Sequence, residues 1–168
     1  EAKGLQAVPL SEFDRETGGG FYGTTYSRSA LWLKEPDDIE LYKVRNQGPL
    51  KVEIPESKIV SDDLFFRSHL EDMDKYPVFL DGNHSYVKIT NPAAKGGKLL
   101  MLKDSYAHAM VPFLIANYSE IYMIDLRYYR EDPAKLVQNE KIGSVMVVYG
   151  MSNIATDNGL ERLNQSAQ

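Results

Sequence analysis

The chain has 168 residues, with 19 Lys and Arg against 24 Asp and Glu, so its net charge is −5. That length suits one domain of roughly 100–200 residues, and an acidic chain without a basic cluster excludes proteins that bind nucleic acid by neutralising phosphates. Apolar residues make up 43% of the chain, with 11 Tyr, 6 Phe and 1 Trp, which excludes a mostly disordered protein.

The residue types that are missing exclude further classes. Cysteine is absent, so disulfide scaffolds, thiolate nucleophiles and Cys-based zinc sites are excluded. His69, His84 and His108 lack the spacing of metal ligands, and we expect neither a metal nor another cofactor. No apolar stretch approaches the ~20 residues of a membrane-spanning helix, so no transmembrane segment is expected. The chain begins with Glu1 instead of Met, and we expect a processed piece from which a signal or anchor segment was removed.

The first half of the chain is predicted to be rich in strands behind an irregular lead-in. Residues 1–20 mix charged residues with three consecutive glycines, a composition typical of loops. Alternating, β-branched and aromatic residues predict five strands, at residues 21–26, 39–44, 50–54, 77–80 and 85–89. The second and third of these flank an Asn-Gln-Gly-Pro turn and are predicted to form an antiparallel pair. Apolar residues three and four positions apart predict a helix over residues 62–75.

The second half is predicted to alternate strands and helices. Three short apolar runs are typical of strands buried on both faces of a parallel sheet, and they cover residues 99–102, 121–124 and 145–149. Helical segments are expected between them at residues 107–116, with a kink at Pro112, and at residues 133–139, which begin with proline. This order predicts two successive βαβ units and an α/β fold with a small parallel sheet.

A candidate site follows from this order, because ligands of open α/β sheets bind beyond the carboxyl ends of the strands. Ser105 lies at the predicted turn from the first buried strand into a helix. Backbone N–H groups and the positive end of the helix dipole favour an oxyanion there, so Ser105 is a candidate nucleophile. Alternatively, Asp104 or Ser105 simply caps the helix.

Two donors follow the other buried strands. Arg127 and Asn153 are expected to point toward the loop of Ser105, where they could bind the negative oxygen of a tetrahedral intermediate. Each has an ordinary alternative as well. Arg127 could form an ion pair with Asp104 or Asp125, and Asn153 could cap a turn.

Several segments resemble one family of proteins. They are Lys-Asp-Ser-Tyr-Ala at residues 103–107, Val-Pro-Phe-Leu at 111–114, and residues 21–29, 79–84 and 120–129. These segments resemble the SGNH-like proteins named DHHW after an Asp-His-His-Trp motif, which are similar to the alginate and cell-wall O-acetyltransferases. The resemblance extends from about residue 21 to residue 157.

The resemblance implies a fold and a set of site residues. The fold would be an SGNH-hydrolase-like three-layer α/β domain over residues 21–160, incomplete at its N-terminal side, followed by a tail at residues 161–168. Asp104 and Ser105 match the Asp-Ser of a Gly-Asp-Ser-Leu motif, with Lys103 in place of the glycine. Asn153 matches an oxyanion-hole asparagine of the family, but it is separated from Gly150 by one residue more than in the usual Gly-x-Asn. The family also has an oxyanion-hole glycine after its second strand, and no matching glycine occurs at that position, which lies near Arg127.

The sequence departs from the family pattern at the catalytic base. A serine nucleophile needs a base and usually a carboxylate that orients it, and the family takes both from its Asp-His-His-Trp segment. Neither that motif nor Asp-x-His occurs here, so we expect the dyad upstream of Glu1 and no activity of this chain alone. His108 is too close to Ser105 in sequence for a well-aligned base. Asn83 and His84 are expected to contact substrate or simply to form a turn.

The function expected from these residues is an acyl-ester enzyme of a bacterial cell surface, hence extracellular, that transfers an O-acetyl group to a polysaccharide or hydrolyses it. The substrate would be a polysaccharide or another acyl ester. Aromatic residues expected near the site suit sugar rings or pack as half-buried side chains; they are Tyr26, Trp32, Tyr106, Tyr128 and Tyr129. The alternative function is a non-catalytic carbohydrate-binding or structural domain of the same fold.

Overall fold

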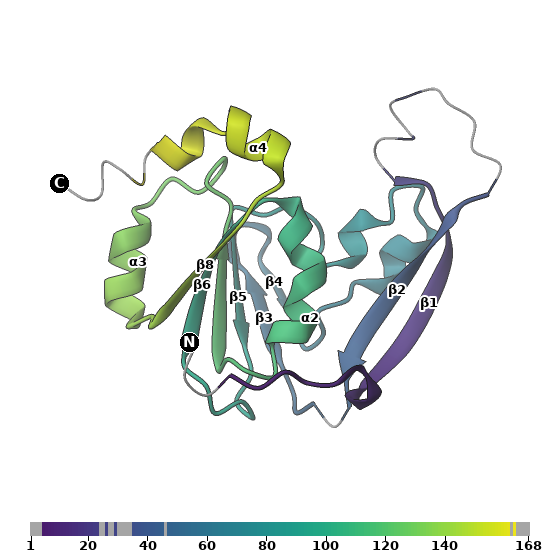
Figure 1. Ribbon diagram of the computed structural model, residues 1–168, viewed down its shortest axis with the longest axis horizontal. Coiled ribbons are helices and arrows are strands. Elements are labelled where there is room, and N and C mark those ends of the chain that lie inside the picture. Colours follow the sequence, from purple (N-terminus) through teal and green to yellow (C-terminus); the bar gives the residue numbers. More distant parts are fainter. Residues whose placement is uncertain are drawn as a thin grey trace.

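The computed structural model of the chain contains a six-stranded sheet and a separate two-stranded sheet (Figure 1). It describes residues 5–23, 26, 29, 35–45, 47–161 and 163. The smaller sheet pairs β1 (Phe13–Phe21) with β2 (Asp37–Val44). The larger sheet has the order β4-β3-β5-β7-β6-β8. Its strands are β3 (Lys51–Ile54), β4 (Ile59–Ser61), β5 (Tyr86–Thr90), β6 (Lys98–Lys103), β7 (Glu120–Ile124) and β8 (Ser144–Val148).

Short helices connect these strands. The α-helices are α2 (Val111–Leu114), α3 (Pro133–Glu140) and α4 (Met151–Thr156). The 3-10 helices are η1 (Leu10–Glu12), η2 (Pro55–Ser57), η3 (Arg67–Glu71), η4 (Tyr76–Val78), η5 (Ser105–Met110) and η6 (Asn158–Glu161). Within the described residues no helix is long and apolar enough to cross a membrane.

The predicted α/β order of the second half is confirmed. β6 is parallel to both β7 and β8, and η5 with α2, and then α3, form the connections. The sheet is larger than predicted and is mixed, because β5 joins β7 in antiparallel pairing and brings β3 and β4 with it. The carboxyl ends of three parallel strands therefore meet at one edge of the sheet.

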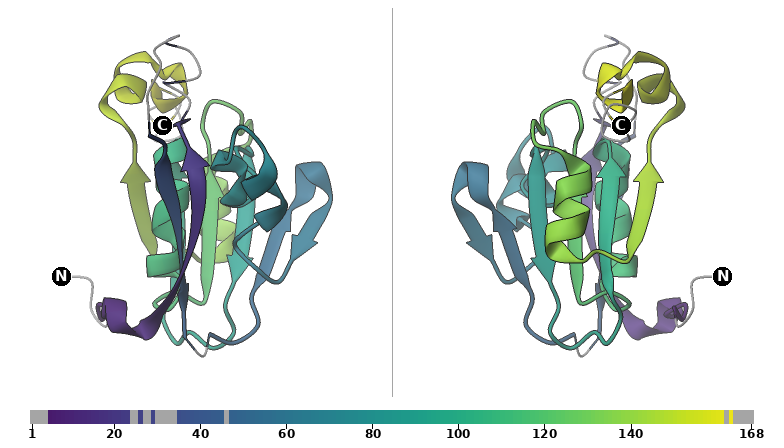
Figure 2. Two further views of the ribbon diagram at one scale, coloured as in Figure 1. Left: turned by 90° about the vertical axis from the view of Figure 1, so that its right-hand side faces the viewer. Right: turned by 90° about the vertical axis from the view of Figure 1, so that its left-hand side faces the viewer.

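Alternating residues of the central strands form one core on each face of the sheet. Leu99 and Met101 of β6 belong to the larger core, whereas Leu100 and Leu102 join a second core on which α3 packs. Figure 2 shows α2 and α3 on opposite faces of the sheet. The continuous apolar run of β6 is thus explained by burial on both faces, as the sequence predicted.

The prediction that the last strand is buried is wrong. Val145 and Val147 of β8 are 55% and 58% exposed, because β8 is the edge strand of the sheet and pairs only with β6 within the described residues. Apolar sequence alone does not distinguish an edge strand from a central one.

The lead-in prediction for residues 1–20 is also wrong in part. The glycine run lies inside β1, where the register against β2 shifts between Gly18 and Phe21. The predicted strand at residues 21–26 shares only Phe21 with β1, and residues 24–25 lie outside the described part. The predicted hairpin between residues 39–44 and 50–54 is not formed, because β2 pairs with β1 and β3 joins the larger sheet. A residue before proline favours extended backbone, so Gly48-Pro49 leads the chain onward to the second sheet instead of reversing it.

The helix predicted at residues 62–75 is reduced to η3. The Asp63 carboxylate accepts a hydrogen bond from the backbone nitrogen of Phe65 at 3.2 Å, and such local side-chain bonds compete with helix formation. The strand predicted at residues 77–80 is likewise absent, since that segment forms η4 and then a single bridge from Phe79 to Phe65. The strand predicted at residues 85–89 is confirmed as β5.

Candidate functional site

The candidate site lies where β6 ends and η5 begins. Asp104 is fully buried there, and its Oδ1 accepts a 2.9 Å hydrogen bond from the backbone nitrogen of Tyr106, so it caps η5. Its Oδ2 accepts bonds from the backbone nitrogen of Gly150 at 2.6 Å and from Asn153 Nδ2 at 2.7 Å. The helix-cap interpretation is therefore correct for Asp104, and the same carboxylate joins the end of β6 to the start of α4.

These contacts keep the buried carboxylate ionised. Burial alone would raise the pKa of Asp104, but the hydrogen bonds from Asn153, Gly150 and Tyr106 hold that pKa below its usual range. A carboxylate that accepts several N–H bonds is stabilised in its charged form. Asp104 thus provides a fixed negative charge next to Ser105.

Ser105 is the first residue of η5 and is half-buried. Its backbone carbonyl accepts a hydrogen bond from the Tyr76 hydroxyl at 3.3 Å. Across the described part of the chain, no side chain forms a hydrogen bond with the Ser105 hydroxyl. The structure thus holds the Ser105 backbone, and its hydroxyl is available to a ligand or to a base.

Tyr76 connects three residues of this region. Its hydroxyl oxygen lies 2.8 Å from His108 Nδ1 and 3.2 Å from Asn83 Oδ1, and the Tyr76 and His108 rings stack at 5.5 Å. Burial lowers the pKa of His108 to about 3, with a further contribution from Lys103. The lowered pKa makes His108 a weak base, and its Nδ1 is engaged with Tyr76, so we do not expect it to deprotonate Ser105. No sequence pattern indicated a role for Tyr76, which directly follows the segment predicted as a helix.

The ring of His84 is held by Glu56 and by the backbone of Asp81. Its Nδ1 lies 2.9 Å from Glu56 Oε1 and its Nε2 lies 3.1 Å from the carbonyl oxygen of Asp81. One ring nitrogen thus contacts the turn and the other contacts η2, and His84 is buried. Of the two expectations for residues 83 and 84, the turn role fits His84, whereas exposed Asn83 is connected to Ser105 through Tyr76.

Arg127 forms one of the two ion pairs that the sequence left open. Its Nε and Nη2 bond the two oxygens of Asp125 at 2.8 Å and 2.6 Å, which raises the pKa of Arg127. Lys103 Nζ lies 3.5 Å from Asp125 Oδ2, and both side chains are fully buried. Burial lowers the pKa of Lys103 to about 8 against the opposing effect of Asp125. Lys103 in the glycine position of the motif therefore helps to hold Asp125, which in turn fixes Arg127.

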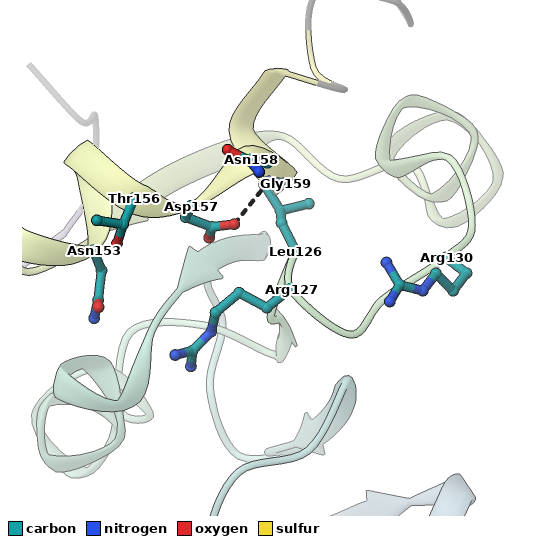
Figure 3. Close-up of a pocket in the computed structure, with 8 residues that line it drawn as sticks. All are labelled: Leu126, Arg127, Arg130, Asn153, Thr156, Asp157, Asn158 and Gly159. Atoms are coloured by element: carbon teal, nitrogen blue, oxygen red, sulfur yellow. Dashed lines mark hydrogen bonds between the residues drawn. The ribbon is translucent and has the colours of Figure 1, made fainter.

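A cavity of about 510 Å³ brings Arg127 and Asn153 together (Figure 3). Loop residues after β7 and the segment from α4 to η6 line it, and these are Leu126, Arg127, Arg130, Asn153, Thr156, Asp157, Asn158 and Gly159. Ser105 does not line the cavity; it is connected to it through Asp104, whose carboxylate binds Asn153. The structure therefore unites four predicted site residues at one sheet edge, which are Asp104, Ser105, Arg127 and Asn153.

Gly150 allows the close packing at this edge. A β-carbon at this position would lie 2.7 Å from Cε2 of Tyr106 and 3.5 Å from Asp104 Oδ2. Tyr106 itself is 67% exposed. The glycine therefore lets the Tyr106 ring lie against the start of α4.

The remaining expectations concern metals and aromatic residues. Among the residues that the structure describes, no group of three or more His, Asp or Glu side chains could hold a metal ion. Tyr128 is exposed and Tyr129 is buried, both in the loop after β7. Tyr26 stacks on Tyr22. Trp32 lies outside the described residues.

Known proteins resemble this chain in family and in fold. The family model described as DHHW protein matches residues 2–124. A crystal structure of a DHHW family protein from Eubacterium siraeum covers 95% of this chain and 54% of its own, with a TM-score of 0.78 and 25% identity. No curated protein matches the sequence.

Two structures of Bacillus cereus PatB1 share the fold at lower identity. One contains a sulfonyl adduct and covers 91% of this chain and 51% of PatB1, with a TM-score of 0.67 and 21% identity. The other covers 88% and 52% of the two chains, with the same TM-score and identity. The chain thus spans about half the length of the solved structures that it matches.

Proposed function

The chain belongs to the DHHW protein family, and we propose that it is part of a serine acyl-ester enzyme with an SGNH-hydrolase-like fold. The observation that carries this proposal is the arrangement at the ends of β6 and β8. There, the buried carboxylate of Asp104 binds Gly150 and Asn153 next to Ser105, whose hydroxyl has no hydrogen-bond partner among the described residues. The SGNH-like domain would cover residues 13–160, because β1 packs as part of the fold.

The proposed reaction begins with attack of Ser105 Oγ on the carbonyl carbon of an acyl ester. The Ser105 proton passes to a base, and the carbonyl oxygen becomes an oxyanion. Asn153 uses one amide hydrogen to bond Asp104, which leaves the other for the oxyanion together with the Ser105 backbone N–H. The alcohol leaves, and water or a sugar hydroxyl then attacks the acyl-serine to release the acyl group.

The base of this reaction is expected from outside the residues described. His84 and His108 are engaged with Glu56 and Tyr76, respectively, and His69 lies between Asp72 and Asp81. The solved relatives contain about as much chain again as the part matched here. We therefore propose that a His–Asp dyad is supplied by sequence beyond these 168 residues.

The proposed substrate is a polysaccharide at a bacterial cell surface, either as the acceptor of an O-acetyl group or as the acetyl ester that is hydrolysed. Support comes from the resemblance to polysaccharide O-acetyltransferases and from tyrosines near the sheet edge. Transfer and hydrolysis use the same acyl-serine and differ in the acceptor, a sugar hydroxyl or water.

An acetyl-ester assay tests the proposal. We would measure release of 4-nitrophenol from 4-nitrophenyl acetate by the longest natively encoded chain, with and without phenylmethanesulfonyl fluoride. This inhibitor suits the question because a sulfonyl adduct, like the one in the PatB1 structure, forms when a nucleophile attacks a sulfonyl group. Activity that is lost in Ser105→Ala and upon inhibitor treatment, but kept in Ser144→Ala at the opposite end of β8, supports the enzyme. Equal activity of Ser105→Ala and the unmodified chain would overturn it.

A non-catalytic carbohydrate-binding domain is the second candidate. One observation favours it: in the described residues each histidine is held by other side chains, and none reaches Ser105. A longest native chain that binds oligosaccharides but shows no Ser105-dependent esterase or transferase activity would establish this candidate instead.

A further inference from the structure

A second cavity lies on the other side of the loop that follows β7. Its volume is about 460 Å³, within the ~300–1,000 Å³ range of small-molecule sites. It is lined by residues from η2, the start of β5, the loop after β7 and α3, which are Pro55, Glu56, Ser85, Tyr86, Tyr128, Tyr129, Arg130, Glu131 and Leu136. Arg130 lines both this cavity and the one next to Asn153.

Three tyrosines give this cavity flat, amphipathic walls. Tyr86 and Tyr129 stack with ring centroids 6.2 Å apart and planes 21° apart. Tyr128 is 53% exposed, and the Arg127 guanidinium lies over its ring at 5.4 Å. Since Asp125 fixes Arg127, Tyr128 is held at the cavity with much of its surface still accessible.

The polar groups of the cavity are fixed in place. Glu56 Oε1 accepts bonds from His84 Nδ1 at 2.9 Å and from the backbone nitrogen of Ser85 at 3.0 Å, and its Oε2 accepts a short bond from the Ser85 hydroxyl. The Tyr129 hydroxyl donates to Glu131 at 3.5 Å. Arg130 is exposed and has no ion pair among the described residues. Donors and acceptors therefore surround the aromatic walls.

We propose that this cavity binds a neutral sugar ring of a polysaccharide. A pyranose presents an apolar face that packs on tyrosine and a rim of hydroxyls that bonds carboxylates and guanidinium groups. A purely apolar ligand would cover the Arg130 guanidinium, which has no ion pair among the described residues, without offering it a partner, which is unfavourable. The cavity contains two carboxylates, of Glu56 and Glu131, and one guanidinium, of Arg130. Because the protein also has a net charge of −5, a polyanionic ligand would be repelled.

This inference deepens the proposed function by naming a subsite for the polysaccharide. If one sugar of a polysaccharide occupies the second cavity, the next sugar of that polysaccharide would lie over Arg130, toward the cavity lined by Arg127 and Asn153. The subsite itself requires no chemistry at Ser105, so binding and catalysis can be measured separately.

Calorimetric titration of the longest natively encoded chain tests the subsite. The probes are cellotetraose and chitotetraose as neutral oligosaccharides and tetragalacturonate as an anionic one. We expect a neutral probe to bind, Tyr128→Ala and Arg130→Ala to weaken binding by about tenfold or more, and Tyr22→Ala to bind as the unmodified chain does. Tyr22 is a matched control because it is 36% exposed and lies outside both cavities.

The outcomes separate this inference from the proposed enzyme. Binding that persists in Ser105→Ala, together with loss in Tyr128→Ala, supports the subsite whether or not Ser105 reacts. No binding of either neutral probe, wild-type binding by both cavity variants, or tighter binding of tetragalacturonate would overturn the subsite and leave the Ser105 assignment to its own assay.

Discussion

The side-chain amide of Asn153 donates a 2.7 Å hydrogen bond to Asp104, although the two residues are 49 positions apart. The same carboxylate oxygen accepts a bond from the Gly150 backbone. This contact fixes the Asn153 amide on the carboxylate of Asp104, the residue before Ser105, and couples the end of β6 to α4. Several predictions of stability and reactivity depend on contacts of this kind.

Asp104→Asn should weaken both the fold and the reactivity of Ser105. The variant loses charge-assisted bonds at a buried site, for which we expect a loss of about 1–3 kcal/mol in the free energy of unfolding. Urea unfolding measures this loss, and the rate of covalent modification at Ser105 should fall as Asn153 loses its orientation. Asp62→Asn, at an exposed position, serves as the control. Unchanged stability and labelling in Asp104→Asn would contradict this role.

Removing Asp125 should cost more stability than removing Lys103. Asp125→Ala leaves the fully buried Lys103 charge uncompensated, which typically costs about 3–5 kcal/mol. Lys103→Met leaves Asp125 still paired with Arg127, so we expect a smaller loss. Chemical denaturation of both variants gives the comparison, and a larger loss for Lys103→Met would show that Lys103 has a role beyond holding Asp125.

Two adjacent glycines should respond differently to the same substitution. A β-carbon at Gly96 would lie 1.8 Å from the carbonyl oxygen of Asn117, whereas nothing lies within 4 Å of one at Gly97. Gly96→Ala is therefore expected to lose more than about 1 kcal/mol, and Gly97→Ala to change by about 0.5 kcal/mol or less. Thermal unfolding of the matched pair measures both, and equal melting temperatures would refute the packing of this loop on Asn117.

His69 should titrate above its ordinary range. Hydrogen bonds to Asp81, and then to Asp72, raise its pKa, since both carboxylates lie 2.9 Å from its ring nitrogens. A raised pKa means that protonated His69 stabilises the fold fully below its unfolded pKa of about 6.5. That stabilisation is lost as the pH rises through the raised pKa.

NMR titration of the His69 ring measures this shift. Asp81→Asn should move the pKa back toward about 6.5, and unfolding of His69→Gln should lack the loss of stability seen in the unmodified chain as the pH rises through the His69 pKa. A His69 pKa at or below the ordinary value would contradict the contacts with both carboxylates.

The sequence predicted the second half of the fold better than the first. Apolar runs at β6 and β7 identify strands that are buried on both faces, and the proline at the start of α3 marks that helix. In the first half, sheet membership depends on pairings between distant segments, such as β1 with β2. Local alternation identifies strands there but does not identify their partners, so the predicted hairpin was wrong.

Part of the site could also be predicted. The sequence predicted that Ser105, Arg127 and Asn153 lie at one edge because each follows a parallel strand, and the structure has them after β6, β7 and β8; their roles in a site stay predictions. Tyr76 was missed because it reaches Ser105 from a 3-10 helix with no periodic signal. The role of Lys103 was missed as well, since the burial of its charge next to Asp125 depends on the assembled sheet.

Covalent labelling of Ser105 tests the central claim most directly. The longest natively encoded chain and the 168-residue chain would each be incubated with a fluorophosphonate, and intact mass and peptide mapping would locate the adduct, with Ser105→Ala and Ser144→Ala as controls. The account predicts one adduct on Ser105 of the long chain, lost only in Ser105→Ala, and little or none on the 168-residue chain. If the long chain is folded but stays unlabelled, or if the adduct is on a different serine, the result would contradict Ser105 as the nucleophile.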